Sequence, residues 1–269
     1  MIQFKNNHIT VFESQLFKTT STVIETDDCV IVVDPTWLPS EVEEIRDYVN
    51  KIKNKKPIYL LFTHSDWDHI LGYGAFPDAI VIASKELYER KDKDQIINQI
   101  KVFDDKYYID RDYPISYPKI DIVVSEDGQV LNIEGTSLTF YKAKGHTDDG
   151  LFSIVEPYGI WIAGDYLSDV EFPYIYFSSE EYEKTLAKTD LILKKHDVKL
   201  LVPGHGHATE NIDEIQKRKK ESLDYIRELR SAILSKRDSF YLLEKYSYLR
   251  AMKDFHEGNI RLLKKEIGK

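Results

Sequence analysis

A dense run of histidine and aspartate at residues 64–69 constrains this chain more than any other feature. It reads HSDWDH and follows the apolar run IYLLF at 58–62, which is typical of a buried strand. Side chains two residues apart on an extended chain project to the same side, so these groups are expected to converge. Imidazole and carboxylate bind borderline divalent metals, and the segment therefore indicates a metal site, with a merely polar loop as the alternative. The candidate ligands are His64, Asp66, Asp68 and His69.

The same arrangement recurs along the chain: a buried strand, a small or turn residue, then His or Asp. The residues delivered in this way are His64, His146, Asp165 and His205. Asp34, after the apolar run 30–33, fits as a fifth instance. Strands that end on the same side of a sheet bring such residues together, because a rigid scaffold offers its loops at one edge. One occurrence is unremarkable, but four occurrences with metal-ligand residue types are hard to explain by packing.

These residues, in this order, resemble the metallo-β-lactamase superfamily. The pieces that carry the resemblance over residues 8–210 are His64-x-Asp66-x-Asp68-His69, Gly145-His146-Thr147, Gly164-Asp165 and Pro203-Gly204-His205-Gly206. The resemblance implies an α+β fold, a four-layer αββα sandwich of two mixed β-sheets flanked by helices. It also implies a metal site at one edge of the sandwich.

The resemblance further implies two divalent metal ions, with zinc as the first expectation and iron or manganese as alternatives. One ion is expected on His64, Asp66 and His146, and the other on Asp68, His69 and His205. Asp165 is expected to bridge them together with a water or hydroxide, which two cations would activate as a nucleophile. Asp68 is expected to orient that nucleophile and is the candidate catalytic residue.

Residue 66 departs from the commonest pattern of the superfamily, because Asp stands where His is usual. Three carboxylates make a harder ligand set, which shifts preference towards iron or manganese. A carboxylate here resembles the flavodiiron branch, which carries Glu at this place, reduces dioxygen or nitric oxide, and has a flavodoxin-like domain. The helical residues 211–269 are expected to leave no room for such a domain.

The first functional hypothesis is therefore a dinuclear metal-dependent hydrolase. Its bridging hydroxide is expected to attack a small ester, thioester, lactone or phosphoester. The alternative is a di-iron redox protein of the same fold, acting on oxygen or nitric oxide. A binding protein with a vestigial metal site is disfavoured, because every ligand position holds a competent ligand.

Several residues near the motifs leave two interpretations open. His207 lies two residues after His205 and is either a substrate-binding residue or a surface histidine. Asp148 and Asp149 either orient a ligand imidazole or form a solvent-exposed turn, and the turn is favoured. Trp67 is expected to pack beneath its loop.

The composition shifts near residue 210, which predicts a metal-binding domain over 1–210 and a C-terminal helical extension over 211–269. The extension resembles in position the helical substrate-binding extension of glyoxalase II enzymes. Its Tyr241, Tyr246 and Tyr248 either roof the site or, as favoured, serve as core aromatics or a dimer surface. The tyrosine-rich segment 104–119 is expected to be irregular, and is either a lid or a packed surface loop.

Local patterns predict the other elements. Strands are expected at 8–14 and 20–33, and a capping box of Ser40 and Glu43 is expected to open a helix. The further helices are expected at 85–103, from Ser178 to 196, from Asn211 to 236, at 239–250 and at 252–267.

The charge and cysteine counts restrict the partners. The 37 basic and 46 acidic residues give a net charge of −9, which disfavours nucleic acid as a partner. Cys29 is the single cysteine and excludes an intramolecular disulfide. The chain lacks a signal-peptide pattern and an apolar run of about 20 residues, so a cytoplasmic protein without a membrane partner is expected. A small-molecule substrate is expected, and a homodimer is compatible with the composition.

Overall fold

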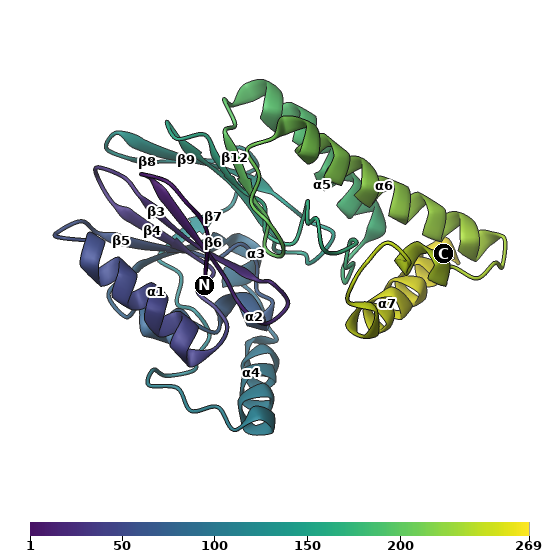
Figure 1. Ribbon diagram of the computed structural model, residues 1–269, viewed down its shortest axis with the longest axis horizontal. Helices are drawn as coiled ribbons and strands as arrows, with labels where there is room; N and C mark the ends of the chain where they lie inside the picture. The colour runs from purple at the N-terminus through teal and green to yellow at the C-terminus, as the bar shows by residue number, and fades with distance from the viewer. Residues whose placement is uncertain (269) are drawn as a thin grey trace.

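Two β-sheets packed face to face, with helices on both outer faces, form the body of the molecule (Figure 1). The computed structural model describes residues 1–268. This arrangement is the four-layer αββα sandwich that the sequence predicts, and the predicted fold class is confirmed.

The first sheet has seven strands in chain order, antiparallel from β1 to β4 and parallel from β4 to β7. Its strands are β1 (Ile2–Lys5), β2 (Ile9–Glu13), β3 (Thr20–Glu25), β4 (Val30–Val33), β5 (Ile58–Leu61), β6 (Ile80–Ser84) and β7 (Ile122–Val124). The second sheet has five strands in the order β12-β11-β10-β9-β8. These are β8 (Val130–Ile133), β9 (Thr136–Lys142), β10 (Leu151–Glu156), β11 (Ile160–Ile162) and β12 (Leu200–Val202).

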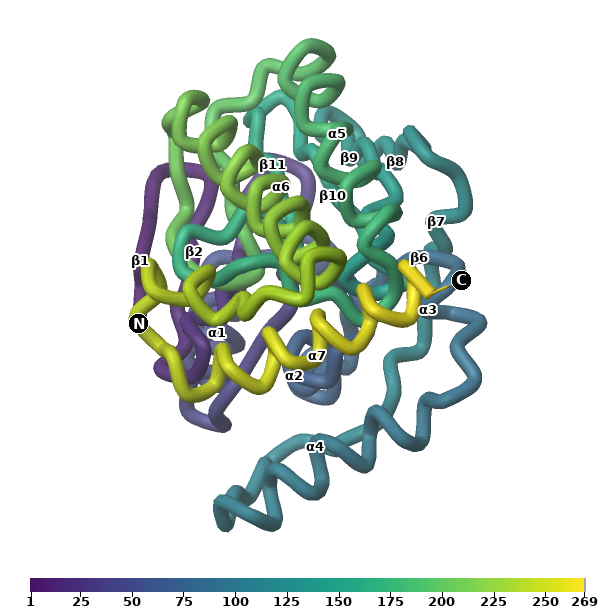
Figure 2. The backbone as a smooth tube through the Cα atoms, turned by 90° about the vertical axis from the view of Figure 1, so that its right-hand side faces the viewer, coloured from purple at the N-terminus to yellow at the C-terminus, as the bar shows by residue number. Residues whose placement is uncertain are grey.

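Helices from each half of the chain cover the sheet of that half. The helices before the second sheet are α1 (Pro39–Ile52), α2 (Trp67–Ile70), α3 (Lys85–Tyr88) and α4 (Lys93–Tyr107), with a 3-10 turn at Tyr73–Ala75. The later ones are α5 (Ser179–Lys195), α6 (Ile212–Leu234) and α7 (Leu249–Ile267), with a 3-10 turn at Phe240–Leu243. Figure 2 shows α6 and α7 crossing the same end of the sandwich. Among residues 1–268, no helix has both the length and the apolar character needed to cross a membrane.

Strand alternation divides the core into three layers. In β4, Val30 and Val32 point to the cluster under α1 and α4, whereas Ile31 and Val33 point between the two sheets. Both faces of this strand are therefore apolar, as expected of a parallel strand covered on both sides. The third layer joins the second sheet to α5, α6 and α7.

Strand direction determines where the polar loops meet. β4, β5 and β6 are parallel, so the chain leaves all three at the same edge of the first sheet. In the second sheet β11 is parallel to β12, and β9 runs the same way because both β9 and β11 are antiparallel to β10. Asp34, His64, His146, Asp165 and His205 all follow strands of these two sets.

Some predicted boundaries are wrong for local reasons. Residues 20–33 form two strands instead of one. The helix predicted from Ser40 begins at Pro39, and Glu41 instead of Glu43 accepts a hydrogen bond from the Leu38 amide at 2.9 Å. Proline is favoured in the first turn, where its missing N–H costs nothing, and it moves the helix start forward.

Two predicted helices also have different bounds in the structure. The helix predicted at 85–103 is split into α3 and α4, and α4 continues to Tyr107, inside the segment predicted as irregular. Between 239 and 250 only the turn Phe240–Leu243 and the start of α7 are helical. The rest of 104–119 is packed: Tyr113 is buried, and Arg111 donates to its hydroxyl and to the Trp37 carbonyl. These contacts favour the packed surface loop.

The C-terminal helices share a core with the second sheet. Tyr225, Ile226 and Leu229 of α6 and Met252 of α7 belong to the same apolar cluster as Phe152 of β10. A domain boundary near residue 210 stays a prediction.

We expect the Leu61→Ala variant to be destabilised by about 2–5 kcal/mol, because it removes a fully buried side chain between the sheets and leaves a cavity. Urea unfolding followed by circular dichroism measures the loss. Leu191→Ala is the matched control: Leu191 is 50% exposed, and its loss should cost less than about 0.5 kcal/mol. Equal effects of the two variants would contradict the assigned core.

Candidate metal centre

One carboxylate lies at the centre of the site and faces four imidazoles. The Asp165 Oδ1 atom lies 3.1 Å from His69 Nε2, and its Oδ2 atom lies 3.2 Å from His146 Nε2. The same Oδ2 is 3.4 Å from His205 Nε2 and 3.7 Å from His64 Nε2. Asp165 follows β11 in the second sheet, whereas His64 and His69 follow β5 in the first. The sheets therefore supply ligands to one common centre.

The other two carboxylates divide the cluster into halves. Asp66 Oδ2 lies 3.2 Å from His146 Nε2 and 3.9 Å from His64 Nε2. Asp68 Oδ2 lies 3.6 Å from His69 Nε2 and 3.7 Å from His205 Nε2. Within each half, one ligand atom from each of the three residues lies within 4.8 Å of the others.

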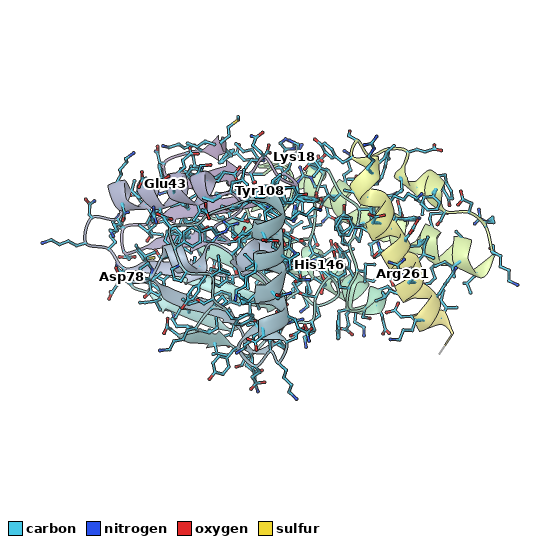
Figure 3. All side chains as sticks on the ribbon, turned by 90° about the horizontal axis from the view of Figure 1, so that it is seen from below. Lys18, Glu43, Asp78, Tyr108, His146 and Arg261 are labelled. Carbon is cyan, nitrogen blue, oxygen red and sulfur yellow. The ribbon has the colours of Figure 1, made fainter. Side chains whose placement is uncertain are left out.

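The structure thus brings together all seven predicted ligand residues in the predicted groups. Two halves on either side of Asp165 are the arrangement expected for two ions that share a bridging carboxylate. Figure 3 shows His146 where the sandwich meets the C-terminal helices. The assignment of these residues as ligands remains a prediction, which the following observations support.

Each imidazole has its far nitrogen occupied, so that Nε2 faces the centre. His146 Nδ1 donates to the Tyr174 carbonyl at 2.7 Å, and His205 Nδ1 donates to the Phe17 carbonyl at 2.9 Å. His64 Nδ1 lies 2.9 Å from the Thr63 hydroxyl, and His69 Nδ1 lies 3.0 Å from Asp34 Oδ2. A partner on Nδ1 determines the tautomer and leaves the Nε2 lone pair free for a metal.

Several of the inward atoms are buried without a hydrogen-bond partner in the described chain. They are His64 Nε2, His69 Nε2, His146 Nε2 and Asp165 Oδ1. A buried polar atom without a partner costs about 1–3 kcal/mol, so four of them side by side are expected only where a ligand satisfies them. Imidazole nitrogens and carboxylate oxygens at this spacing fit divalent metal ions, and the fit is independent of any resemblance.

Asp34 lies behind the centre and supports it. Its Oδ1 accepts from the Thr63 amide at 2.9 Å, and its Oδ2 accepts from the Thr63 hydroxyl at 2.5 Å. The same Oδ2 faces His69 Nδ1, and the Thr63 hydroxyl in turn faces His64 Nδ1. Asp34, His64 and His69 could also form a ligand trio by distance, but these Nδ1 atoms are already hydrogen-bonded. We therefore assign Asp34 to the support of two ligands.

Glycine is required where the loops of the second sheet meet. A Cβ on Gly204 would collide with Asp165 Oδ1 and with the backbone of Gly164. Gly164 itself has a φ of 50°, a conformation that residues with a side chain rarely adopt. The small residues before Asp165 and His205 thus permit both loops to reach the same carboxylate.

Burial and mutual charge determine the protonation of the metal-free site. Burial alone would lower the pKa of His205, but Glu171 and Asp165 raise it to about 10. Burial likewise opposes charge on His69 and His146, yet Asp165 raises the pKa of both well above the usual value. For His64, burial and the neighbouring His69 lower the pKa to about 3.

The pKa of the central carboxylate, Asp165, is shifted downwards, opposite to the pKa values of His69, His146 and His205. Burial alone would raise the pKa of Asp165, but His205, His69 and the other imidazoles hold it well below its usual range. At neutral pH the metal-free site therefore stores protons on imidazoles that a cation would displace.

The remaining predicted residues have mixed outcomes. His207 is half exposed and pairs with Asp169, its Nδ1 lying 2.8 Å from Asp169 Oδ2; its role towards substrate stays a prediction. The exposed turn favoured for Asp148 and Asp149 is wrong for Asp149, which is buried and accepts from Arg90 at 3.1 Å. Trp67 packs edge-on against Trp37 with ring centroids 4.7 Å apart, as expected.

The sequence reasoning missed two residues beside the centre. Glu171 Oε1 lies 3.9 Å from His205 Nδ1, and burial raises the pKa of this carboxyl to about 7. The ring of Tyr176 lies 5.1 Å from that of His146. Both belong to residues 171–177, which form no regular element, so no strand-end pattern could have identified them.

We expect metal binding at pH 7 to release up to about three protons, one each from His69, His146 and His205. Because these pKa values are raised, the imidazoles are charged at pH 7 and become neutral only as the pH rises, so apparent affinity should increase with pH. The His205 contribution should disappear above its folded pKa of about 10. Calorimetric titration with Zn²⁺ in buffers of different ionisation enthalpy counts the protons. Binding at pH 7 without proton release would contradict this charge distribution.

We expect Asp34→Asn to weaken metal binding by about 10–100-fold, because the carboxylate accepts on both oxygens, from the Thr63 amide on one and from the Thr63 hydroxyl and His69 on the other, whereas the NH₂ group of the amide would face one of these donors. Asp197→Asn changes the same functional group at a side chain that is 89% exposed and should bind metal as the wild type does. Competition with a chromophoric chelator gives both affinities. Equal affinities would show that Asp34 does not support the ligands.

Comparison with known proteins agrees with this geometry. The metallo-beta-lactamase superfamily profile matches residues 15–205. No curated protein matches the chain. A metallo-beta-lactamase family protein from Thermus thermophilus has a similar structure, with 15% identity, a TM-score of 0.66, and coverage of 95% of this chain and 94% of that one.

Two further solved structures share the fold. The inverting sec-alkylsulfatase Pisa1 from Pseudomonas sp. matches with 12% identity and a TM-score of 0.69, over 96% of this chain and 50% of that chain. A B3 metallo-beta-lactamase described by an active-site glutamic acid matches with 18% identity and a TM-score of 0.53, over 81% and 86%. At these identities the likeness concerns the fold. The profile match over most of the chain, together with the strand-end cluster, shows that the protein belongs to the metallo-beta-lactamase superfamily.

Proposed function

We propose that this protein is a dinuclear metal-dependent hydrolase that acts on a small ester, thioester, lactone or phosphoester. One observation carries the proposal: four imidazole Nε2 atoms lie 3.1–3.7 Å from the oxygens of Asp165, with Asp66 and Asp68 on either side. His64, Asp66 and His146 would hold one ion, and Asp68, His69 and His205 the other.

A bound pair of divalent ions would supply a hydroxide at neutral pH and would stabilise an oxyanion. The residues of the chain position that chemistry. Asp68 is the carboxylate suited to orient the hydroxide, because it lies close to both His69 and His205. Nδ1 partners hold the imidazoles in place, which keeps the ligand geometry organised before a substrate arrives.

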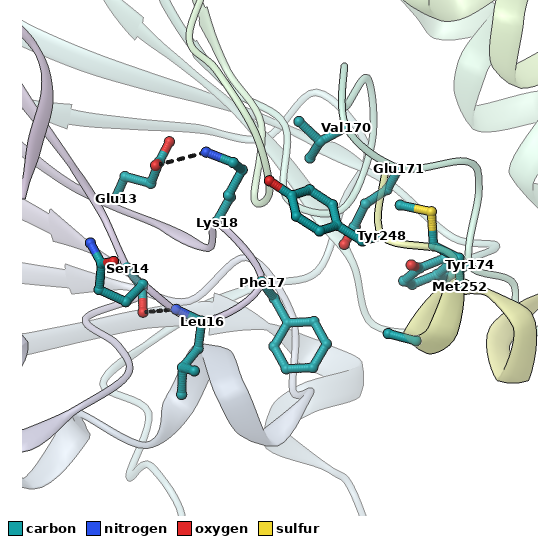
Figure 4. Close-up of a pocket in the computed structure, with 12 residues that line it drawn as sticks. Glu13, Ser14, Leu16, Phe17, Lys18, Val170, Glu171, Tyr174, Tyr248 and Met252 are labelled. Carbon is teal, nitrogen blue, oxygen red and sulfur yellow. Dashed lines mark hydrogen bonds and ion pairs between the residues drawn. The ribbon is translucent and has the colours of Figure 1, made fainter. Parts of the chain in front are cut away.

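A cavity of about 450 Å³ beside the centre supports a small-molecule substrate. Residues 13–18, Glu171, Tyr174 and α7 line it, and its size is that of typical small-molecule sites. Figure 4 shows the ring of Tyr248 between Lys18 and Glu171. Glu171 and Tyr174 also line a small recess at Asp165 and His205, so the cavity adjoins the metal centre.

The lining of this cavity favours a substrate with an apolar arm. Phe17, Tyr174, Tyr248 and Met252 supply the apolar surface, and the amine of Lys18 is already paired with Glu13 at 3.1 Å. The similar structures include an alkylsulfatase and β-lactamases by name. Their names support hydrolysis as the reaction class. Because their substrates differ, the bond that this protein cleaves has to be identified by experiment.

The second candidate is a di-iron redox protein, and Asp66 is the observation that favours it. Its Oδ2 lies 3.2 Å from His146 Nε2 in the position of a ligand. A third carboxylate makes the ligand set chemically harder, which shifts preference towards iron or manganese. An additional carboxylate at the site is also compatible with hydrolysis, since one similar B3 metallo-beta-lactamase is described by an active-site glutamic acid. Metal analysis of protein purified without added metal, with oxygen-uptake measurements, separates the two candidates. Stoichiometric iron with oxygen consumption and no hydrolysis would favour the redox protein.

We expect Asp165→Ala to abolish hydrolysis, with a loss of at least about 10³-fold, because both halves of the centre lose their shared carboxylate. His64→Ala should have a similar effect, and far-ultraviolet dichroism should remain native in both variants. A panel of thioesters, lactones, phosphodiesters and neutral esters of increasing chain length measures turnover.

Asp197→Asn is a suitable control for these variants. The Asp197 side chain is 89% exposed and is not among the proposed ligands. The variant should retain turnover within a few-fold of the wild type. Undiminished turnover in Asp165→Ala would overturn the proposed centre.

A further inference from the structure

The C-terminal helix α7 reaches the metal centre through a buried amide. Asn259 is 1% exposed. Its Oδ1 accepts from the Ile175 amide at 2.9 Å, and its Nδ2 donates to the Pro173 carbonyl at 2.7 Å. The second Nδ2 hydrogen is directed to the Tyr225 hydroxyl at 3.0 Å. The side chain thus uses both of its donors and an acceptor, a pattern that no other side chain of this size can provide.

The peptide unit held by Asn259 is the one that contacts a proposed ligand. The Tyr174 carbonyl and the Ile175 amide belong to the same peptide plane. The amide donates to Asn259, and the carbonyl accepts from His146 Nδ1 at 2.7 Å. One rigid peptide therefore separates Asn259 from the imidazole, and such hydrogen bonds polarise one another in a dry environment.

Other contacts of the same helix hold this peptide in place. The ring of Phe255, one turn before Asn259, stacks on Tyr174 with centroids 4.1 Å apart and an interplanar angle of 16°. The Tyr225 hydroxyl that meets Asn259 also lies 2.7 Å from His256 Nδ1, whose Nε2 lies 2.9 Å from the Ser239 hydroxyl. A buried polar chain in the C-terminal helices thus ends at the peptide that orients His146.

We propose that Asn259 is a positioning residue for the metal ligand His146: it fixes the 174–175 peptide, and this peptide holds the imidazole with Nε2 towards the centre. The inference rests on the metal centre proposed above and does not depend on the substrate. It assigns the C-terminal helices a role in metal binding, in addition to their contact with the substrate cavity. Only the half of the centre that contains His146 should depend on Asn259.

Zinc titration of the metal-free chain, monitored by calorimetry, tests this inference. His146→Ala and His205→Ala identify which binding step belongs to which half. Asn259→Leu and Asn259→Ala should then weaken the step of the His146 half by about 10–100-fold and leave the other step within about threefold. Ala leaves room for water at the Pro173 carbonyl and the Ile175 amide, so it provides the result if the Leu variant fails to fold.

Leu263→Ala is the matched control, because Leu263 lies one turn after Asn259 on α7 and is 1% exposed but packs only through apolar contacts. It should lower the urea midpoint without changing either binding step. Cobalt absorption spectra of the loaded variants add a second readout, since a displaced imidazole alters the ligand field of one ion.

The outcomes separate this inference from the metal centre itself. If Asn259→Ala binds zinc in both steps as tightly as the wild type, only the role of Asn259 is overturned. The same holds if Asn259→Ala and Leu263→Ala each weaken both binding steps to the same extent. A wild-type chain that takes up no metal would overturn the proposed centre and this inference with it.

Discussion

The convergence of strand ends at one edge of two packed sheets is the constraint on which the site depends. β4, β5 and β6 leave the first sheet there, and β9, β11 and β12 leave the second. The apolar layer between the sheets holds the two edges together, and close-packed protein interiors allow little movement. Burying four imidazoles around Asp165 costs free energy. On flexible loops these side chains would turn towards water instead. The rigid sandwich keeps them facing the carboxylate.

Much of this site could be predicted because strand-end residues follow a local rule. An apolar run followed by His or Asp marks His64, His146, Asp165 and His205 without any three-dimensional information. The grouping of these residues into two halves came from the family resemblance, and the distances agree with it. The helix caps at Ser178 and Asn211 were likewise predictable, since a polar side chain accepting from the first-turn amides is a local interaction.

The parts that could not be predicted depend on contacts between distant segments. The role of Asp34 requires Thr63 and His69 to lie beside β4, and the burial of Asp149 requires Arg90 to reach it. Asn259 stands in a polar, helical stretch where an amide has no distinctive pattern, and its partners Pro173 and Ile175 are 86 and 84 residues away. One error has a local cause instead: the sequence predicts that α1 begins from Ser40, but it begins at Pro39 because proline is favoured in the first turn of a helix.

The C-terminal helices are best understood as part of the same physical unit as the centre. Their apolar side chains share a core with the second sheet, and the buried amide of Asn259 is bonded to the peptide that faces His146. Loss of the Asn259 hydrogen bonds would loosen residues 171–177, which also contribute Glu171 and Tyr174 to the cavity wall. Metal binding and substrate binding would then respond together to changes at Asn259, although α7 supplies none of the seven proposed ligands. A helical extension can therefore influence a metal centre at the edge of the sandwich through one irregular segment placed between them.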